Sequence, residues 1–300
     1  MNIEAKSKLN REEILLRNLS SITEEKKTIE EEKRLLLRDY YEYILSETLS
    51  FSAAARMLLS QYRLRREKAR EIKQPRADTI KEKTLIAKLL ASRYSLEDLL
   101  EVSSETLRQV QASASIACWM SNRYSSLAYD RFCSLIPNDE LIQSDSFVDV
   151  CERIHRGECD FGILPIENST DGRLNSFYRM LDKYELKISA VCNIEDEEGD
   201  AFTGFAMVSR EVYQFGGSYP RRIELSVISS NAQKMLDMIG AADQFEMSVM
   251  RLSSVPLYYR GNACVDTVTL EISENTALPF FIYLFLFGKD INVIGLYIQI

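Results

Sequence analysis

The chain has 300 residues, 46% of them hydrophobic, and 45 acidic residues against 37 basic ones give a formal net charge of −8. This length favours two or three domains with packed cores, and the acidic balance disfavours nucleic acid as a partner. No segment approaches the roughly 18 uncharged apolar residues of a membrane span, and the charged N-terminus lacks a secretion signal. We therefore expect a cytoplasmic protein that binds neither membrane nor nucleic acid.

The six cysteines show no CxxC pair and are expected as buried thiols in a reducing compartment. A metal site on Cys151, His155 and Cys159 is an alternative, because these residues recur at every fourth position. Cys159 is expected to lie past the end of that helix, however, and no fourth ligand is evident. We expect neither a metal nor a cofactor.

Glycine divides the chain into two halves of different character. All 11 glycines occur at Gly157 or later. Because glycine supplies turns, the first half is expected to be almost wholly helical and the second half mixed α/β. Residues 1–111 are also mildly basic, whereas the remainder is acidic.

The helical half is expected to contain a lead segment, residues 1–35, and a helical module, residues 36–111. A long amphipathic stretch is predicted over Leu35–Lys73, ending before Pro75. Capping residues predict helix starts at Asn10, Ser21, Asp78 and Ser95.

The end of the long stretch, residues 56–73, holds seven basic residues against two acidic ones. Three interpretations stay open. These side chains form a solvated face that suits the helix C-terminal dipole, a nucleic-acid arm, or an anion pocket on a helix bundle.

The helical half resembles the all-helical chorismate mutase family. The resemblance rests on Leu37-Arg38, on basic residues near the helix end, and on a Pro-x-x-Asp-x-x-Lys-Glu run at 75–82. Ser104 is nearest to a serine of the family's last helix. Members bind the two carboxylates of chorismate through arginine and lysine, with glutamate and glutamine on its ether and hydroxyl oxygens. The resemblance implies Glu82 as a catalytic residue and substrate contacts at Arg38, Arg56, Arg66, Lys81 and Gln109.

Residues 112–215 are expected to form a small α/β lobe. Alternating patterns predict strands at 115–120, 161–166 and 186–193 and helices at 124–133, 148–156 and 175–183. Ser146 is expected to cap the second helix and Gly157 to end it. The stretch Cys159–Gly172 then places a carboxylate, an amide and two hydroxyls after a buried strand, where small ligands bind in open α/β sheets. A simple turn could use the same residues.

The run Ser-Phe-x-x-Val…Gly-x-x-Asp-Phe-Gly-Ile-x-Pro-Ile-Glu-Asn-Ser, residues 146–169, resembles the signature of prephenate dehydratases. The lobe is then expected to be of periplasmic-binding-protein-like type. Mutase followed by dehydratase is the order in the bifunctional enzyme of phenylalanine synthesis. The family converts prephenate to phenylpyruvate, carbon dioxide and water without a metal or cofactor, and its Thr-Arg-Phe motif is matched by Thr203-Gly204-Phe205. The resemblance implies Thr203 as the leaving-group donor, with substrate contacts at Asn168, Ser169, Phe205 and Ser125.

Two departures from that family affect the expected activity. Trp119 and Asn122 stand where the first turn has glycines, and Gly204 replaces the motif arginine. The family also places a second lobe before the Thr-Arg-Phe motif, whereas only 33 residues lie between Ser169 and Thr203. A single lobe neither surrounds the substrate nor excludes water. Dehydratase activity is therefore expected to be strongly reduced or absent.

Residues 221–300 are predicted as a ferredoxin-like βαββαβ unit. This order resembles the ACT-type regulatory domain that follows prephenate dehydratases. Both phenylalanine-binding motifs are altered here, and the resemblance implies regulatory-ligand contacts at Asn231, Ala232 and Ser254. ACT domains commonly pair edge to edge, so a homodimer is expected.

The sequence thus predicts an α plus α/β protein with an all-helical module, a truncated α/β lobe and a ferredoxin-like domain. The expected function is that of a degenerate mutase–dehydratase relative that acts on chorismate or prephenate or binds phenylalanine. The first alternative is a non-catalytic relative that senses an aromatic amino acid or pairs with an intact enzyme. The second alternative is a helical scaffold that uses the basic face of residues 56–73.

Overall fold

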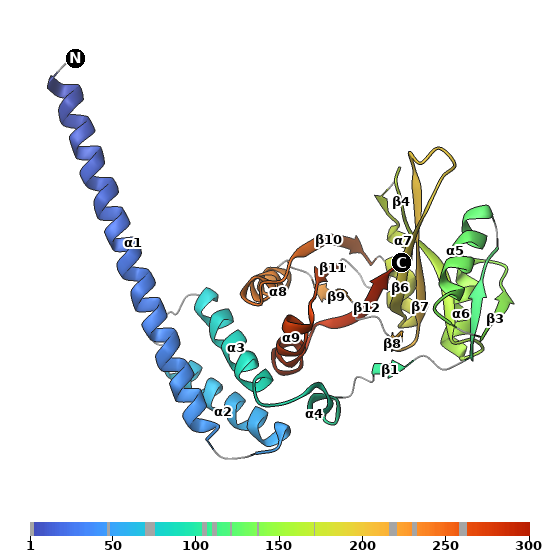
Figure 1. Ribbon diagram of the computed structural model, residues 1–300, viewed down its shortest axis with the longest axis horizontal. Coiled ribbons are helices and arrows are strands. Elements are labelled where there is room, and N and C mark those ends of the chain that lie inside the picture. The colour runs from blue at the N-terminus through green and yellow to red at the C-terminus, as the bar shows by residue number, and fades with distance from the viewer. Residues whose placement is uncertain are drawn as a thin grey trace. The chain divides into compact units, whose positions relative to one another are not determined.

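The chain forms two compact units, Met1–Ser92 and Arg93–Ile300 (Figure 1). The computed structural model describes residues 3–46, 49–69, 76–103, 107–109, 113–120, 122–136, 138–170, 172–215, 221–229, 233–257 and 263–300. Within these residues, no helix is long and apolar enough to cross a membrane.

The first unit consists of helices. They are α1 (Ile3–Ile44), α2 (Phe51–Ala69) and α3 (Arg76–Ala91). The C-terminal part of α1 packs against α2 and α3 around fully buried side chains, among them Tyr41, Leu58, Ile86 and Leu90. This apolar core holds the unit together, because a helix is stable in water mainly through the face that it buries.

The helix boundaries differ from the prediction at α1. No glycine or proline occurs before Pro75, and α1 runs without a break through Asn10, Ser21 and residue 35. The lead segment is therefore continuous with the module. The long stretch predicted over Leu35–Lys73 is instead two helices, separated between Ile44 and Phe51. Ser50 begins the second one, where its hydroxyl accepts a hydrogen bond of 3.4 Å from the Ala53 N–H.

The last predicted helix of the module is much shorter than expected. Ser95 and Asp98 form the predicted capping box, but α4 (Leu96–Leu100) ends after five residues. Ser104 lies outside the described residues. Gln109 lies in strand β1 (Leu107–Gln109), which pairs in parallel with β8 (Val212–Gln214), and both strands belong to the second unit. Gln109 thus belongs to a strand and not to the predicted helix.

The α/β lobe of the second unit contains the predicted helices and strands and, in addition, strands at Asn138–Gln143, Gly172–Arg173 and Phe202–Ser209 that were not predicted. Its helices are α5 (Arg123–Cys133), α6 (Phe147–Arg156) and α7 (Asn175–Tyr184). Its further strands are β2 (Ser113–Cys118), β3 (Asn138–Gln143), β4 (Phe161–Asn168), β5 (Gly172–Arg173), β6 (Lys187–Glu195) and β7 (Phe202–Ser209). The strand order β6-β7-β4-β2-β3 places β2 parallel to both β3 and β4, and β7 antiparallel to both β4 and β6.

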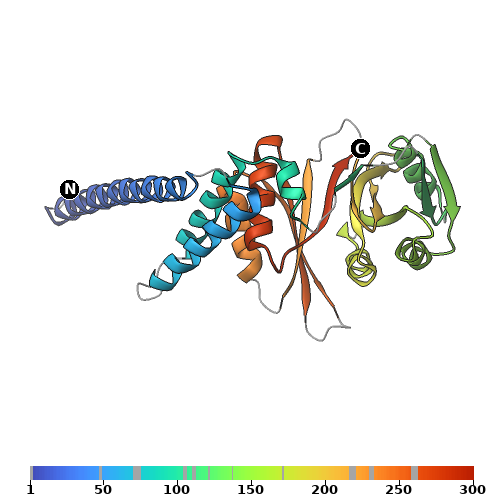
Figure 2. The same cartoon turned by 90° about the horizontal axis from the view of Figure 1, so that it is seen from below.

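The C-terminal part has the predicted βαββαβ order. Its elements are β9 (Arg222–Ser229), α8 (Gln233–Gln244), β10 (Val249–Pro256), β11 (Cys264–Glu271), α9 (Glu274–Phe287) and β12 (Asn292–Gln299). The strand order is β10-β11-β9-β12, all antiparallel, and Figure 2 shows both helices on one side of these strands. Strand β12 also pairs in parallel with β6, so the lobe and the C-terminal part share one sheet.

A buried carboxylate lies at the junction of these two parts. Glu224 of β9 is fully buried and accepts a hydrogen bond of 2.5 Å from the Tyr178 hydroxyl of α7 and one of 2.9 Å from the Tyr297 hydroxyl of β12. Two donors on one buried carboxylate offset its loss of hydration. The contact therefore fixes α7 to the C-terminal strands as well as to its own lobe.

The end of α6 yields a first prediction. Gly157 terminates this helix at φ 76°, and its N–H donates to the Arg153 and Ile154 carbonyls. An added Cβ would suffer left-handed backbone strain and would meet the Arg210 guanidinium at 3.1 Å. We expect Gly157→Ala to lower the free energy of unfolding by about 1–2 kcal/mol in urea titrations. Gly199→Ala, at φ 76° in open space, isolates the backbone contribution, and an unchanged midpoint for Gly157→Ala would contradict the prediction.

Candidate functional site

Three of the predicted site residues come together where β4 ends and β7 begins. Asn168 lies opposite Thr203 in the antiparallel β4–β7 pair. Ser169 follows directly, and its N–H donates to the Phe202 carbonyl at 2.9 Å while its hydroxyl accepts from the Phe202 N–H at 3.1 Å. The pairing of β4 with β7 thus joins the Glu-Asn-Ser run to the Thr-Gly-Phe run.

The side chains of these residues differ in what they are free to bind. The Asn168 Oδ1 accepts a hydrogen bond of 3.0 Å from the Thr170 N–H, which closes a local turn. The Ser169 hydroxyl is engaged by Phe202. The half-buried Thr203 hydroxyl forms no hydrogen bond to another residue that the structure describes. Thr203 therefore presents an uncommitted hydroxyl donor at this edge of the sheet.

Phe205 lies deeper than a pocket wall would. Its side chain is 3% exposed and belongs to the core between the sheet and α5, together with Phe161 and Cys192. Because side chains alternate along a strand, Phe205 and Thr203 share a face of β7, with Phe205 one step further into the core. Phe205 is thus part of the core beneath Thr203 and does not line a pocket.

The N-terminus of α5 starts from the same edge of the sheet. It follows β2, which is parallel to β4. Asn122, where the family has a glycine, caps this helix by accepting from the Ser125 N–H at 3.0 Å. Ser125 is 1% exposed, and its hydroxyl also reaches the Asn122 Oδ1 at 3.3 Å. In this arrangement the predicted substrate contact Ser125 is committed to the helix cap.

A short turn replaces any long excursion between β6 and β7. Strand β6 ends at Glu195 and β7 begins at Phe202. The turn between them closes through a hydrogen bond of 2.9 Å from the Asp196 N–H to the Ala201 carbonyl. Within it, Glu197 contacts Arg123 at the start of α5. The chain therefore returns to the site at once, and no second lobe lies between these two strands.

The opposite face of β7 carries a polar cluster that sequence reasoning missed. Gly204 stands between Glu167 of β4 and Asn193 of β6. Glu167 forms an ion pair with Arg251 of β10, and the buried Asn193 Oδ1 has no hydrogen-bond partner among the described residues. The contact between Arg251 and Glu167 joins strands far apart in the sequence. The only related signal in the sequence is Gly204, which stands where the motif has an arginine.

Gly204 gives a second prediction. Its φ is not positive, but an added Cβ would lie 2.8 Å from the Glu167 Cγ and 3.2 Å from the Asn193 Oδ1. We expect Gly204→Ala to lower the free energy of unfolding by about 1–3 kcal/mol, because the Glu167 and Asn193 side chains already pack closely over Gly204. The test is a double-mutant cycle with Glu167→Ala, in which removal of the obstructing side chain is expected to reduce the cost of the alanine. Simple additivity of the two effects would argue against this contact as the cause.

The predicted mutase site of the helical unit is assembled from different residues. Glu82 is 3% exposed and accepts hydrogen bonds from the Tyr41 hydroxyl at 2.6 Å and the Arg65 Nε at 2.9 Å. Burial and the hydrogen bond to Glu82 raise the pKa of Tyr41 well above its usual value, and burial raises that of Tyr62 to about 12. Arg65, which is the residue before the predicted Arg66, is thus the cation that reaches the buried glutamate.

Three of the other predicted mutase contacts have partners outside this cluster. Arg38 pairs with Glu42 along α1, the Arg56 Nε donates to the Ser52 carbonyl of its own helix, and Lys81 pairs with Glu30. These side chains lie on exposed helix surfaces. The predicted pocket of convergent cations is therefore not formed by this set. A helix rotates by about 100° per residue, so a one-residue error in choosing an arginine changes the face on which it lies.

The alternative metal site is not formed either. Cys151 and Cys159 are buried, and burial raises the pKa of each thiol to about 12. The His155 Nδ1 lies 3.2 Å from the Tyr184 carbonyl. Across the residues with described positions, no group of three His, Cys, Asp or Glu side chains is arranged to hold a metal ion.

The structure describes one of the three predicted regulatory-ligand residues. Ser254 of β10 donates a hydrogen bond of 2.6 Å to Asp266 on the adjacent strand β11. Asn231 and Ala232 lie outside the described residues. The regulatory site therefore stays a prediction.

Comparison with known proteins identifies relatives of the lobe. Residues 121–211 match the family model for prephenate dehydratase. A segment of 49 residues is 45% identical to a prephenate dehydratase of Lactococcus lactis subsp. lactis and 43% identical to one of L. lactis subsp. cremoris. It covers 15% of this chain and 18% of each relative, so the match spans less than a fifth of the curated proteins.

A solved structure extends the likeness at the level of fold. The prephenate dehydratase of Streptococcus mutans aligns with a TM-score of 0.51 at 17% identity, over 62% of this chain and 99% of that one. The predicted resemblance of the lobe to prephenate dehydratases is thereby confirmed. The mutase-like and ACT-like assignments stay predictions.

Proposed function

We propose that this protein binds a prephenate-like ring carboxylate at the ends of β4 and β7, with dehydratase turnover strongly reduced or absent. The observation that carries this proposal is the arrangement around β7. Asn168 and Ser169 meet Thr203 as a dehydratase-like site would require, yet β6 returns directly into β7 through a short turn.

The retained groups suit recognition of such a ligand. Conversion of prephenate to phenylpyruvate removes a ring carboxylate as carbon dioxide and expels the ring hydroxyl, which takes up a proton as it leaves as water. The free Thr203 hydroxyl is the group suited to donate a hydrogen bond to that leaving oxygen. The Asn168 amide, on the strand opposite, is placed to orient a carboxylate. The protein need supply no further chemical group, because formation of the aromatic ring drives the loss of carbon dioxide and water.

The same arrangement explains why turnover is expected to be low. A single hydroxyl donor contributes to departure of hydroxide mainly in a closed, water-excluded site, where electrostatic interactions are strong. Here the connection from Asp196 to Ala201 is a hydrogen-bonded turn, too short to supply an enclosing lobe. Substrate bound at this edge stays in contact with water.

The test is a direct assay of phenylpyruvate formation from prephenate by the purified full-length chain. We expect a rate at least about 100-fold below that of an intact two-lobed dehydratase, as for loss of a major donor from an enclosed site. Thr203→Val serves as the control for any residual rate, since this hydroxyl has no hydrogen bond to lose among the residues that the structure describes. A rate close to that of the intact enzyme would overturn the proposal of reduced turnover.

A second candidate function is regulatory, and the shared sheet favours it. Strand β12 of the C-terminal part pairs with β6 of the lobe, and Arg251 of β10 contacts Glu167, the residue before Asn168. An aromatic amino acid bound by an ACT-like domain, with contacts at Ser254, Asn231 and Ala232, would thus be coupled to the site through the shared sheet. Calorimetric titration with phenylalanine tests this function; absence of binding at millimolar concentration would exclude it.

For the helical unit we propose a structural role. This proposal rests on Glu82, whose carboxylate is buried and held by Tyr41 and Arg65, and on the separate partners of Arg38, Arg56 and Lys81. Chorismate is therefore not expected to be consumed by the purified protein. Conversion of chorismate to prephenate that is lost in Glu82→Gln would instead establish a mutase.

A further inference from the structure

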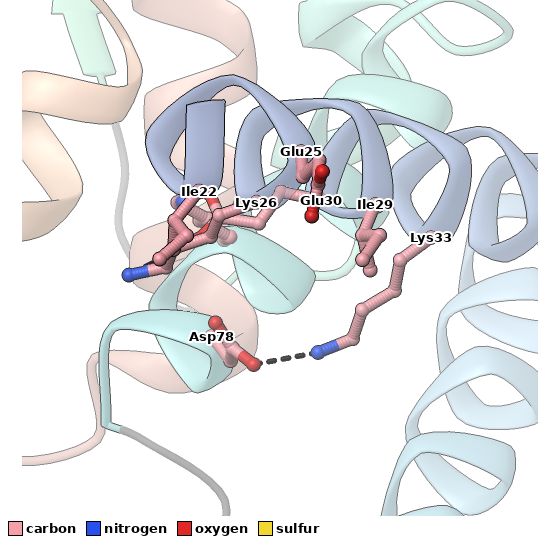
Figure 3. Close-up of a pocket in the computed structure, with 8 residues that line it drawn as sticks. Ile22, Glu25, Lys26, Ile29, Glu30, Lys33 and Asp78 are labelled. Carbon is pink, nitrogen blue, oxygen red and sulfur yellow. Dashed lines mark hydrogen bonds and ion pairs between the residues drawn. The ribbon is translucent and has the colours of Figure 1, made fainter. Parts of the chain in front are cut away.

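Two hollows of similar volume differ in how their charged side chains are balanced. The first, of about 560 Å³, lies in the helical unit between α1 and the start of α3 (Figure 3). Three lysines and three carboxylates line it, and the Lys33 Nζ is 2.5 Å from the Asp78 carboxylate. The second, of about 520 Å³, lies in the second unit between α5 and the end of β6. We call this second hollow the α5–β6 groove.

The floor of the α5–β6 groove is an open edge of the sheet. Strand β12 pairs with β6 only as far as Val191, whose carbonyl accepts a hydrogen bond of 2.9 Å from the Ile300 N–H. Because the backbone groups of every second residue point to the same side of a strand, those of Asn193 and Glu195 point to this side as well. Among the described residues, no strand pairs with them there. Their N–H and carbonyl groups are therefore available to a further strand.

The wall of the groove is one face of α5. It presents Leu127, Asp130, Arg131 and Ser134, which recur three and four residues apart and therefore lie on one side of the helix. All four are exposed, whereas the side of α5 that packs on the sheet is buried. The groove thus combines an unpaired strand edge with a neighbouring helix face. Extended peptides bind such edges by adding a strand to the sheet, and their side chains contact the adjacent wall.

Negative charge predominates around the groove. Asp130 and Glu195 line it and form no ion pair with another described residue, and Arg131 is the cation among the lining residues. The turn that continues from β6, residues 196–200, adds four further carboxylates. One of these contacts an arginine at the start of α5. The balance of charge around the groove therefore favours a partner that carries positive charge.

We propose that the α5–β6 groove binds an extended basic peptide segment of another protein, which adds as a strand to the free edge of β6. The unpaired backbone groups call for an extended chain, and the carboxylates call for lysine or arginine side chains along it. This proposal does not depend on the function proposed for the lobe.

Other occupants fit the charges less well. A second copy of this chain would bring the same carboxylates into the contact, and a nucleic acid would bring phosphates. Prephenate has two carboxylates and is disfavoured for the same reason, although Ile194 of the groove lies opposite Thr203 in the sheet. The groove is thus a site separate from the candidate site at Thr203.

Fluorescence anisotropy with a labelled heptapeptide of alternating lysine and valine tests the proposal on the full-length chain. We expect saturable binding at micromolar concentration, weakened about tenfold in Asp130→Asn/Glu195→Gln. The matched control Glu271→Gln/Glu274→Gln removes two exposed carboxylates of the C-terminal part and is expected to bind like the parent chain. Absence of saturable binding, equal affinity of the two double variants, or equal affinity for the peptide with glutamate in place of lysine would overturn the proposal.

N-methylation of the peptide distinguishes strand addition from attraction by charge alone. In an added strand, the N–H groups of alternate residues donate to β6, and the others point to solvent. Two further peptides are therefore compared, one N-methylated at its lysines and the other at its valines. We expect one of them to bind at least about tenfold more weakly than the unmethylated peptide and the other to bind within about threefold of it. Equal effects of the two methylation patterns would overturn strand addition.

Sedimentation equilibrium of the same variants tests whether the groove joins two copies of the chain. We expect Asp130→Asn/Glu195→Gln to leave the sedimenting mass of the parent chain unchanged. A change in mass that Glu271→Gln/Glu274→Gln does not share would identify the groove as a contact between copies and would overturn the proposal.

Discussion

Raising the pH from 9 to 10 is expected to remove several kcal/mol of folding stability from the second unit, Arg93–Ile300. Four of its thiols, those of Cys118, Cys151, Cys159 and Cys192, are buried, and burial raises the pKa of each from 9.0 to about 12. Between these values the unfolded chain releases protons that the folded chain retains. The contribution of each thiol is therefore fully present below pH 9 and is lost progressively as the pH rises toward 12.

The size of this effect follows from the number of thiols. Each contributes up to about 1.4 kcal/mol per pH unit, so four together give roughly 5 kcal/mol per unit in the middle of the range. Urea midpoints measured at half-unit steps from pH 8 to 11 give the slope. Cys118→Ala/Cys192→Ala lowers the starting stability by creating cavities but is expected to reduce the slope by about half. Equal slopes for the parent and the variant would show that the loss comes from other groups.

Replacing Arg65 with methionine is expected to lower the stability of the helical unit by about 3 kcal/mol. The Glu82 carboxylate is 3% exposed and would keep only the Tyr41 hydroxyl as a hydrogen-bond donor among the residues that the structure describes. A buried charge that loses its partner is strongly destabilising, because the remaining group is not rehydrated. Removal of Arg65 and removal of Glu82 are therefore expected to differ in cost. Arg65 is one-third exposed and reaches water when its partner is lost, whereas Glu82 does not.

Two variants isolate this ion pair in urea titrations followed by circular dichroism. Arg63→Met removes an exposed arginine from the same helix and is expected to change stability by less than about 0.5 kcal/mol. Tyr41→Phe removes one donor but keeps the cation, with an expected cost of about 1–2 kcal/mol. If Arg65→Met behaves like Arg63→Met, the buried pair does not stabilise the unit.

Local signals located several helix ends and the C-terminal element order in the second half of the chain, but not the strand at Asn138–Gln143. Ser146 and Gly157 bound α6 as predicted because each acts through hydrogen bonds within its own helix terminus. The βαββαβ order after residue 221 also followed from strand and helix patterns. The pairing of β12 with β6 could not be predicted in this way, since it joins residues about a hundred positions apart.

The helical half was less predictable for a related reason. Without glycine or proline before Pro75, nothing in the sequence marks the end of α1. The helix also continues through the apparent capping boxes at Asn10 and Ser21, because no helix-breaking residue precedes either of them. The choice of Arg66 over Arg65 shows a further limit. Amino-acid type indicates a cation, but helix rotation and tertiary packing decide which one reaches Glu82.

At the candidate site, the motif predicted the position of Thr203 better than the roles of its neighbours. Asn168 and Thr203 are opposite one another because the two motifs occupy adjacent strands. Ser125 and Phe205 are instead committed to a helix cap and to the core. Neither commitment is readable from residue type, because both depend on the turn that follows β2 and on the depth of β7 within the sheet.

Calorimetric titration of the purified chain with prephenate, with phenylpyruvate measured in the same sample, tests the central claim most directly. We expect saturable binding that is weakened at least tenfold in Thr203→Val, with no accumulation of phenylpyruvate beyond the rate in buffer. Steady phenylpyruvate formation that depends on Thr203, or the absence of any saturable binding, would contradict the account of a site retained for binding without efficient turnover.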